Sequence, residues 1–138
     1  MNKFRQIFSA LFILRLGLGI NMLMHGLVRI PKLNTFVFKM ATGFTDTLLP
    51  EIIIKPFLFM LPFLELSVGI LILVGGKAGQ YGFALCGLLL AALLFGTTLK
   101  EDWGTAGTQM IYVLAAVYGL SLYAQPENKN DSTYTFQK

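Results

Sequence analysis

The sequence predicts an all-α integral membrane protein: a four-helix bundle with a short amphipathic segment between its first and second spans. Hydrophobic residues make up 55% of the 138 residues and charged residues only 13%, whereas soluble domains carry about a quarter charged residues. Four apolar stretches are also long enough to cross a hydrocarbon core of ~30 Å. Short polar or glycine-containing segments separate these stretches. Together these observations predict a multi-pass protein of the cell (inner) membrane in contact with the lipid bilayer.

The first predicted span covers residues 7–30. At ~1.5 Å per residue this stretch reaches ~36 Å. Pro31 follows it and pushes the preceding residue out of helical geometry, so we expect the span to end at Ile30. The basic N-terminus is similar to that of a signal peptide. Because Arg15 interrupts the apolar run and no small-residue cleavage site follows, we expect the span to be retained.

Four polar side chains share one face of this first span. Placed on a helical wheel, Arg15, Asn21, His25 and Arg29 fall within an arc of about 120°. Ionisable groups exposed to hydrocarbon cost several kcal/mol, so they usually face the protein interior or a wet cavity. We therefore expect the other helices to cover this polar stripe.

The amphipathic segment covers residues 31–47. Phe36, Met40 and Phe44 recur every four residues, with lysines and an aspartate between and after them. This pattern predicts a short helix that lies either on the membrane surface or against the bundle.

The other spans follow in the order expected for a bundle with short connections. They are predicted over residues 50–75, 79–99 and 104–124. A glycine-rich turn is expected over residues 75–82, and Asp102 is the expected N-cap of the last span. Residues 1–125 form the predicted transmembrane domain, and the polar tail 126–138 is predicted to be disordered. The basic N-terminal residues favour both termini on the cytoplasmic side.

Glu65 is the only charged residue deep in the second span. If Ile30 and Pro56 mark the same membrane face, Glu65 lies level with Asn21. Arg15 is then the expected ion partner of Glu65, because a guanidinium is always charged.

The other polar residues complete the predicted site. His25 titrates near neutral pH when unperturbed. Arg29 is expected to extend to the membrane interface. We predict that His25 and Glu65 are the catalytic residues, and that the ligand-binding residues are Arg15, Asn21, Arg29 and Gln109. The same groups could instead only join helices by hydrogen bonds, which is the more common role of intramembrane Gln109, Thr108 and Thr97.

Composition excludes several other classes of site. The single cysteine, Cys86, rules out an intrachain disulfide and a CxxC redox pair. The single histidine rules out a bis-histidine haem or a multi-histidine metal site within one chain. We therefore expect no metal and no covalent cofactor. The basic residues are scattered, which gives no reason to expect nucleic acid as a partner.

Two motifs resemble the DoxX family. One is R-L-G-L-G followed by H-G-L-V-R-I within residues 15–30, and the other is P-F-L-E-L-S-V-G-I-L-I-L-V-G over residues 62–75. The resemblance covers about residues 5–124. It implies four helices in the cytoplasmic membrane and places Arg15, His25 and Glu65 at the family's polar positions. The family takes its name from a membrane subunit of a thiosulfate:quinone oxidoreductase, so a membrane quinone is the implied cofactor.

The sequence leaves three functions open, and it does not decide whether the protein is an enzyme. The first is a membrane subunit of a quinone-linked, thiosulfate- or thiol-related redox system, working with a soluble or membrane-bound redox partner. The second is a non-catalytic anchor or scaffold for a soluble redox partner. The third is a pathway for small solutes or protons, which would need a homo-oligomer to line a pore.

Overall fold

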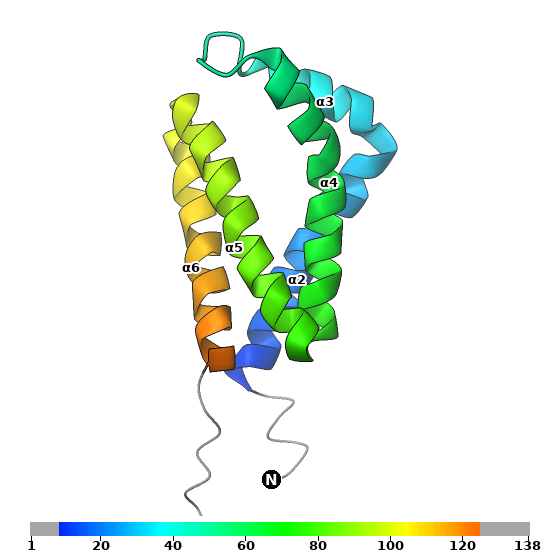
Figure 1. Ribbon diagram of the computed structural model, residues 1–138, viewed down its shortest axis with the longest axis vertical. Coiled ribbons are helices and arrows are strands. Elements are labelled where there is room, and N and C mark those ends of the chain that lie inside the picture. The colour runs from blue at the N-terminus through cyan, green and yellow to red at the C-terminus, as the bar shows by residue number, and fades with distance from the viewer. Residues whose placement is uncertain (1–8, 125–138) are drawn as a thin grey trace, which may run out of the picture.

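The protein is described by a computed structural model over residues 9–124, all of whose regular structure is helical (Figure 1). The helices are α2 (Ala10–Arg29), the short 3₁₀ turn η1 (Ile30–Lys32), α3 (Leu33–Thr42), α4 (Glu51–Val74), α5 (Gly76–Leu99) and α6 (Trp103–Ala124). Within the described residues, four helical segments are long and apolar enough to span a membrane: Ala10–Thr42, α4, α5 and α6. The predicted fold class is confirmed. The start of the first predicted span and the tail 126–138 lie outside the described residues.

The first span begins and ends for local reasons. Ser9 caps α2, because its hydroxyl accepts a hydrogen bond from the backbone N–H of Phe12 at 3.1 Å. At the other end, Pro31 changes the helix into the turn η1, and α2 ends at Arg29. The predicted end at residue 30 is therefore correct to within one residue.

The predicted amphipathic segment forms α3, which lies against the bundle. Val37 and Ala41 are buried where α3 packs on α4. Phe36, Met40 and Phe44, which the sequence placed on one apolar face, line a cavity inside the protein. Of the two predicted positions for this segment, the structure shows the one against the bundle.

The turn between α4 and α5 is much shorter than predicted. The sequence indicated a turn over residues 75–82, but α5 already begins at Gly76. Gly75 and Gly76 have φ values of 77° and 56°, in the left-handed region that glycine adopts without a steric penalty. Two left-handed residues reverse the chain directly, so the following glycines become part of the helix.

Glycines allow α2 and α4 to pack backbone against backbone. A Cβ atom on Gly26 would overlap the carbonyl oxygen of Pro62 and the amide nitrogen of Leu66. A Cβ atom on Gly69 would likewise overlap the backbone of Leu23. These close contacts fix how far α4 lies along α2.

The bundle is tight at the Gly75 end and open at the other. Near the turn, Gly82 of α5 lies so close to Ile72 of α4 that a Cβ atom would stand 2.8 Å from its amide nitrogen. The ribbons of α4 and α5 separate with distance from this turn, while α6 stays beside α5 (Figure 1). The protein therefore consists of two helix pairs, α2 with α4 and α5 with α6, which diverge towards the α3 end.

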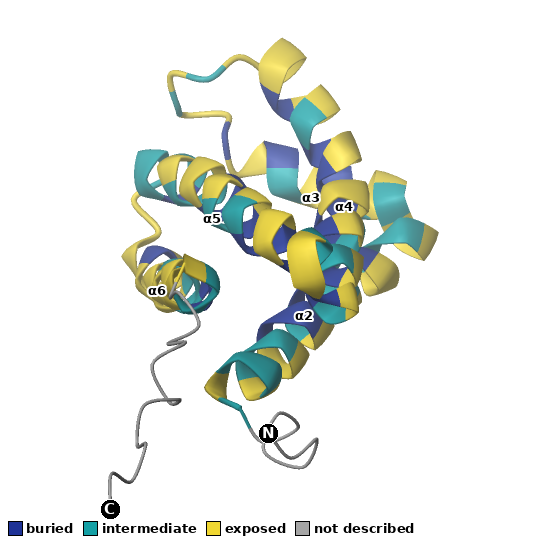
Figure 2. Ribbon diagram, turned by 60° about the horizontal axis from the view of Figure 1, so that its bottom comes forward, coloured by how far each residue is buried: buried dark blue, intermediate teal, exposed yellow. Residues whose placement is uncertain are grey.

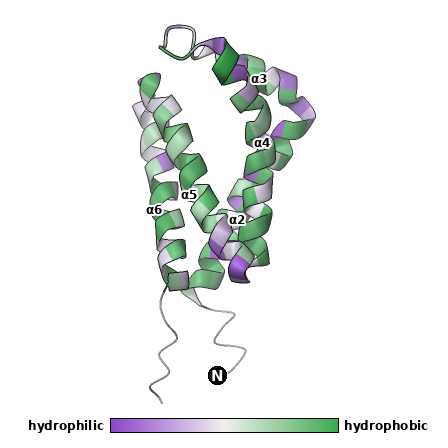
Figure 3. Ribbon diagram, in the orientation of Figure 1, coloured by the Kyte–Doolittle hydropathy of each residue, from purple (hydrophilic) through white to green (hydrophobic). Residues whose placement is uncertain are grey.

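The outer surface suits a bilayer. Large apolar side chains such as Leu88, Ile111 and Leu114 are well exposed on the outer faces of the helices. Buried positions face inward (Figure 2), and hydrophobic residues dominate α4, α5 and α6 (Figure 3). In water such a surface would aggregate. These features identify a multi-pass membrane protein.

Candidate functional site

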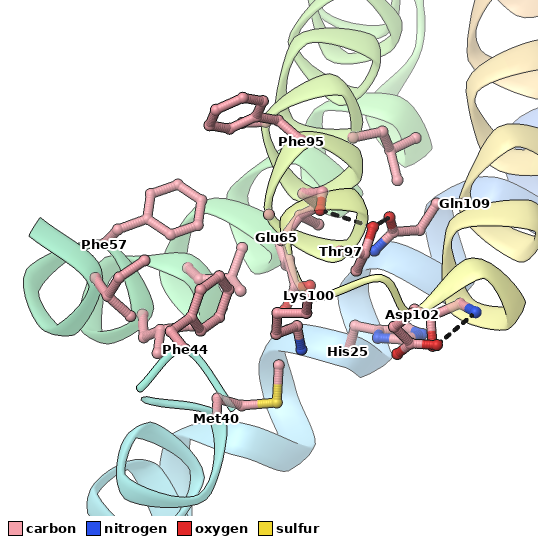
Figure 4. Close-up of a pocket in the computed structure, with 18 of the residues that line it drawn as sticks. His25, Met40, Phe44, Phe57, Glu65, Phe95, Thr97, Lys100, Asp102 and Gln109 are labelled. Carbon is pink, nitrogen blue, oxygen red and sulfur yellow. Dashed lines mark hydrogen bonds between the residues drawn. The ribbon is translucent and has the colours of Figure 1, made fainter. Parts of the chain in front are cut away.

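A cavity of about 630 Å³ lies between the two helix pairs, at the end away from Gly75. Its walls come from α2, α3, α4, α5 and α6. The volume falls in the ~300–1,000 Å³ range of small-molecule and cofactor sites. Figure 4 looks into this cavity and shows many of the side chains on its walls.

Glu65 and Arg29 form an ion pair on the wall of this cavity. The Nη1 atom of Arg29 lies 2.6 Å from each carboxylate oxygen of Glu65. The Glu65 side chain is only 4% exposed and that of Arg29 is 25% exposed. The guanidinium also lies over the ring of Phe36, 4.9 Å from its centroid, a favourable cation–π contact.

The predicted partner of Glu65 was therefore wrong. The prediction aligned Ile30 with Pro56, but the contacts of Gly26 with Pro62 and Leu66 set a different alignment, in which α4 extends past the end of α2. Glu65 consequently lies about one helical turn nearer to the end of α2 than expected. There it is within reach of Arg29, which does not extend to the membrane interface as predicted.

Arg15 lies at the opposite end of the bundle and takes no part in the cavity. Its Nε atom donates to the carbonyl of Ile72 at 3.0 Å, and its Nη2 atom donates to the carbonyl of Leu73 at 2.6 Å. Its guanidinium also occupies the space beside the α carbon of Gly75. These carbonyls belong to the last turn of α4, which has no intrahelical donors of its own. Arg15 therefore stabilises a helix end and the α4–α5 turn.

The two remaining polar residues of the α2 stripe have different positions. His25 is half-buried and lines the cavity beside the Arg29–Glu65 pair. Asn21 lies outside this cavity. Its Nδ2 atom is 3.5 Å from the hydroxyl of Tyr112 on α6, a weak polar contact between the first and last spans.

Gln109 joins two helices, which is one of its two predicted roles, and its ligand-binding role stays a prediction. Its Oε1 atom accepts a hydrogen bond from the hydroxyl of Thr97 at 2.7 Å, which joins α5 to α6 (Figure 4). Both residues also line the cavity. The hydrogen bond leaves the amide NH₂ group of Gln109 as a donor.

Tyr112 and Lys100 are two of the polar cavity residues that the sequence analysis did not assign to the site. Tyr112 lies three residues after Gln109 and so shares its helix face, a spacing that could have revealed it. Phe44 lies in the loop after α3, and the Nζ atom of Lys100 is 5.0 Å from the centroid of its ring. No local sequence pattern predicts that Lys100 and Phe44 meet, because they lie far apart in the chain.

The cavity has a polar side and an aromatic side (Figure 4). His25, Thr97 and Gln109 lie on one side, towards α2 and α6. Phe57 and Phe95, from α4 and α5, lie on the other. This division suits a ligand that combines a polar end with an apolar body.

No protein-family model matches this chain, and no curated protein or solved structure matches it either. The resemblance to the DoxX family therefore stays a prediction.

Proposed function

We propose that the protein is the membrane subunit of a quinone-linked redox system of the cytoplasmic membrane, and that its cavity binds the quinone. The observation that carries this proposal is the division of the cavity into a polar side and an aromatic side. A membrane quinone has the same division: a flat head group with carbonyl oxygens that accept hydrogen bonds, attached to an apolar chain. The resemblance to the DoxX family points to the same ligand.

The polar side offers hydrogen-bond donors for the two carbonyl oxygens of the head group. These donors are the imidazole of His25, the hydroxyl of Tyr112 and the amide NH₂ of Gln109. In this proposal His25 supplies a proton, because an imidazole N–H can donate directly to a carbonyl oxygen of the head group. Glu65 holds the guanidinium of Arg29 in place, and that cation stabilises negative charge on a reduced head group.

Reduction of a quinone to a quinol consumes two electrons and two protons. The chain has one cysteine, Cys86, which is buried among apolar side chains. One thiol cannot form a disulfide within the chain, so the chain cannot supply the two electrons in this way. The proposal therefore includes a partner protein that oxidises a thiol or sulfur compound and passes its electrons to the bound quinone. In this arrangement the membrane subunit positions the head group and delivers protons.

The test begins with the full chain, purified in mild detergent. Lipids that co-purify with the protein are extracted and searched for a quinone. In a second measurement, the binding of an added short-chain benzoquinone is followed. We expect saturable binding that weakens at least about tenfold in His25→Ala and Glu65→Gln, because each removes or displaces a polar group at the head. Ser67→Ala is the matched control, since Ser67 lies on α4 two residues from Glu65 but outside the cavity.

Two results would overturn the proposal. The first is the absence both of co-extracted quinone and of saturable benzoquinone binding in the parent protein. The second is unchanged affinity in folded His25→Ala and Glu65→Gln variants. A stoichiometric co-purified protein without any quinone would support the scaffold hypothesis instead.

A further inference from the structure

On its aromatic side the cavity is lined by exposed or half-buried side chains of both α4 and α5. Four of these side chains define what we name the α4–α5 opening: Ile53, Phe57, Ala92 and Phe95. All four line the cavity. Ile53 and Phe95 are also 58% exposed, and Ala92 is exposed as well. A side chain that borders both the cavity and the lipid-facing surface marks a place where the two meet.

The arrangement of the helices explains why the opening lies there. Near Gly75, α4 and α5 are in close contact through Gly82 and Ile72. Further along they diverge, and Figure 1 shows the separation widening towards the α3 end. The opening lies on this diverging part, within the membrane-spanning length of both helices.

The loop that follows α3 covers part of the end of the cavity nearest the membrane surface. Phe44 in this loop is buried, and its ring contacts the α5 backbone at Gly96, where an added Cβ atom would stand 3.4 Å from it. Lys100 at the end of α5 lies over the same ring and beside Gly43. These contacts bridge the two helix pairs, and Asp102, Thr105 and Thr108 beside them both line the cavity and are exposed. A small polar molecule could therefore enter at this end, whereas an apolar chain would have to leave the bilayer to do so.

We propose that the ligand enters sideways from the bilayer through the α4–α5 opening, with its polar head leading and its hydrocarbon chain left in the opening. This inference rests on the proposed function and specifies its substrate class: a membrane-dissolved amphiphile with a single apolar chain and an uncharged, hydrogen-bond-accepting head, as in an isoprenoid quinone. The head reaches the polar side formed by His25, Gln109 and Tyr112. The chain lies between Phe57 and Phe95.

Two neighbouring alanines on α5 provide a matched test. Ala92 and Ala91 are both exposed, but only Ala92 lines the cavity. Ala92→Phe narrows the opening, whereas Ala91→Phe adds the same ring to the outer surface. The proteins are reconstituted in vesicles, and the uptake of two probes is followed: a benzoquinone with an isoprenoid chain and the same head group without a chain.

We expect Ala92→Phe to slow uptake of the chain-bearing probe at least about tenfold, since binding then waits for the helices to part. Uptake of the chainless probe should change little, and Ala91→Phe should match the parent protein for both probes. Equal uptake of the chain-bearing probe by the parent and Ala92→Phe proteins would overturn the inference. So would an equal slowing of both probes.

A second measurement tests the opening even if the protein binds no quinone. Tyr112→Trp, made in a Trp103→Phe background, places a single fluorescent reporter on the far wall of the cavity. Phospholipids with brominated acyl chains should quench this reporter, and Ala92→Phe should reduce the quenching while Ala91→Phe does not. Absence of quenching, or the same quenching in both alanine variants, would overturn the opening. Quenching without any quinone binding would disprove the proposed function alone.

Discussion

The Nη1 atom of Arg29 lies 2.6 Å from both carboxylate oxygens of Glu65, so one ion pair joins the last turn of α2 to the middle of α4. The pair lies on the cavity wall, and the backbones of the two helices touch beside it at Gly26. Its position means that one contact holds the α2–α4 pair together and also supplies a charged surface to the cavity.

Breaking this pair from one side should cost more stability than removing it altogether. Arg29→Gln leaves the Glu65 carboxylate buried without its cation, and losing one partner of a buried pair typically costs about 3 kcal/mol. The double variant Arg29→Gln/Glu65→Gln should regain most of this loss. Thermal unfolding in detergent measures both. A double variant as unstable as the sum of the two single variants would contradict the prediction.

Arg15 should matter for stability and not for ligand binding. Arg15→Met keeps much of the side-chain length but removes the hydrogen bonds to the carbonyls of Ile72 and Leu73. Hydrogen bonds from a charged donor are worth about 1.5–3 kcal/mol, so we expect a clear fall in the unfolding temperature. The affinity for a short-chain benzoquinone should stay within experimental error of the parent value. A loss of benzoquinone binding without a loss of stability would instead support the sequence prediction that Arg15 binds the ligand.

The two glycines of α2 that differ most in their surroundings give a direct test of the helix contact. Gly26→Ala forces a Cβ atom into the backbone of α4 at Pro62, so the helices must separate and the protein should lose stability. Gly17→Ala meets nothing within 4 Å and should be neutral or stabilising by up to ~1 kcal/mol, because alanine favours helix. Comparable losses in the two variants would show that the contact at Gly26 is not tight.

Asp102 should make the start of α6 sensitive to acid. Its carboxylate accepts a hydrogen bond from the backbone N–H of Thr105 at 3.1 Å, and hydrogen bonding with Thr105 lowers the pKa of the Asp102 carboxyl group below its usual value. A group whose pKa is lower in the folded state stabilises the fold above its unfolded pKa, and this contribution is lost as pH falls through the folded pKa.

The measurement is the unfolding temperature as a function of pH. Asp102→Asn keeps a capping side chain but cannot titrate, so its unfolding temperature should fall less steeply with acid than that of the parent protein. Thr108→Ala is a suitable control because it removes no acidic group. Identical pH profiles in the parent and Asp102→Asn proteins would show that the cap does not titrate as expected.

The sequence predicted the elements of this fold well, because they depend on local properties. The apolar lengths, Pro31 and the four-residue spacing of Phe36, Met40 and Phe44 act within one segment, and the structure confirms the spans and the inner face of α3. The cap at Asp102 is a short-range signal of the same kind.

The ion partner of Glu65 could not be found in this way, because it depends on how far α4 lies along α2. The prediction placed Pro56 level with Ile30 at one membrane face, but α4 runs without a break through Pro56. The alignment is decided instead by contacts at Gly26 and Gly69, between segments far apart in the chain. An alignment that differs by about one helical turn makes Arg29, and not Arg15, the ion partner of Glu65.

Because α4 and α5 are held together at the tight turn at Gly75, a small change in the angle between them moves their far ends by a much larger distance. Ile53 lies 22 residues before Gly75, a distance of ~33 Å at helical rise. A change of only about 5° in the angle between α4 and α5 at the turn would therefore move the far end by ~3 Å, about the diameter of a water molecule. Helix tilt responds to the thickness of the surrounding bilayer. A membrane that changed the angle between α4 and α5 would therefore also change the width of the cavity.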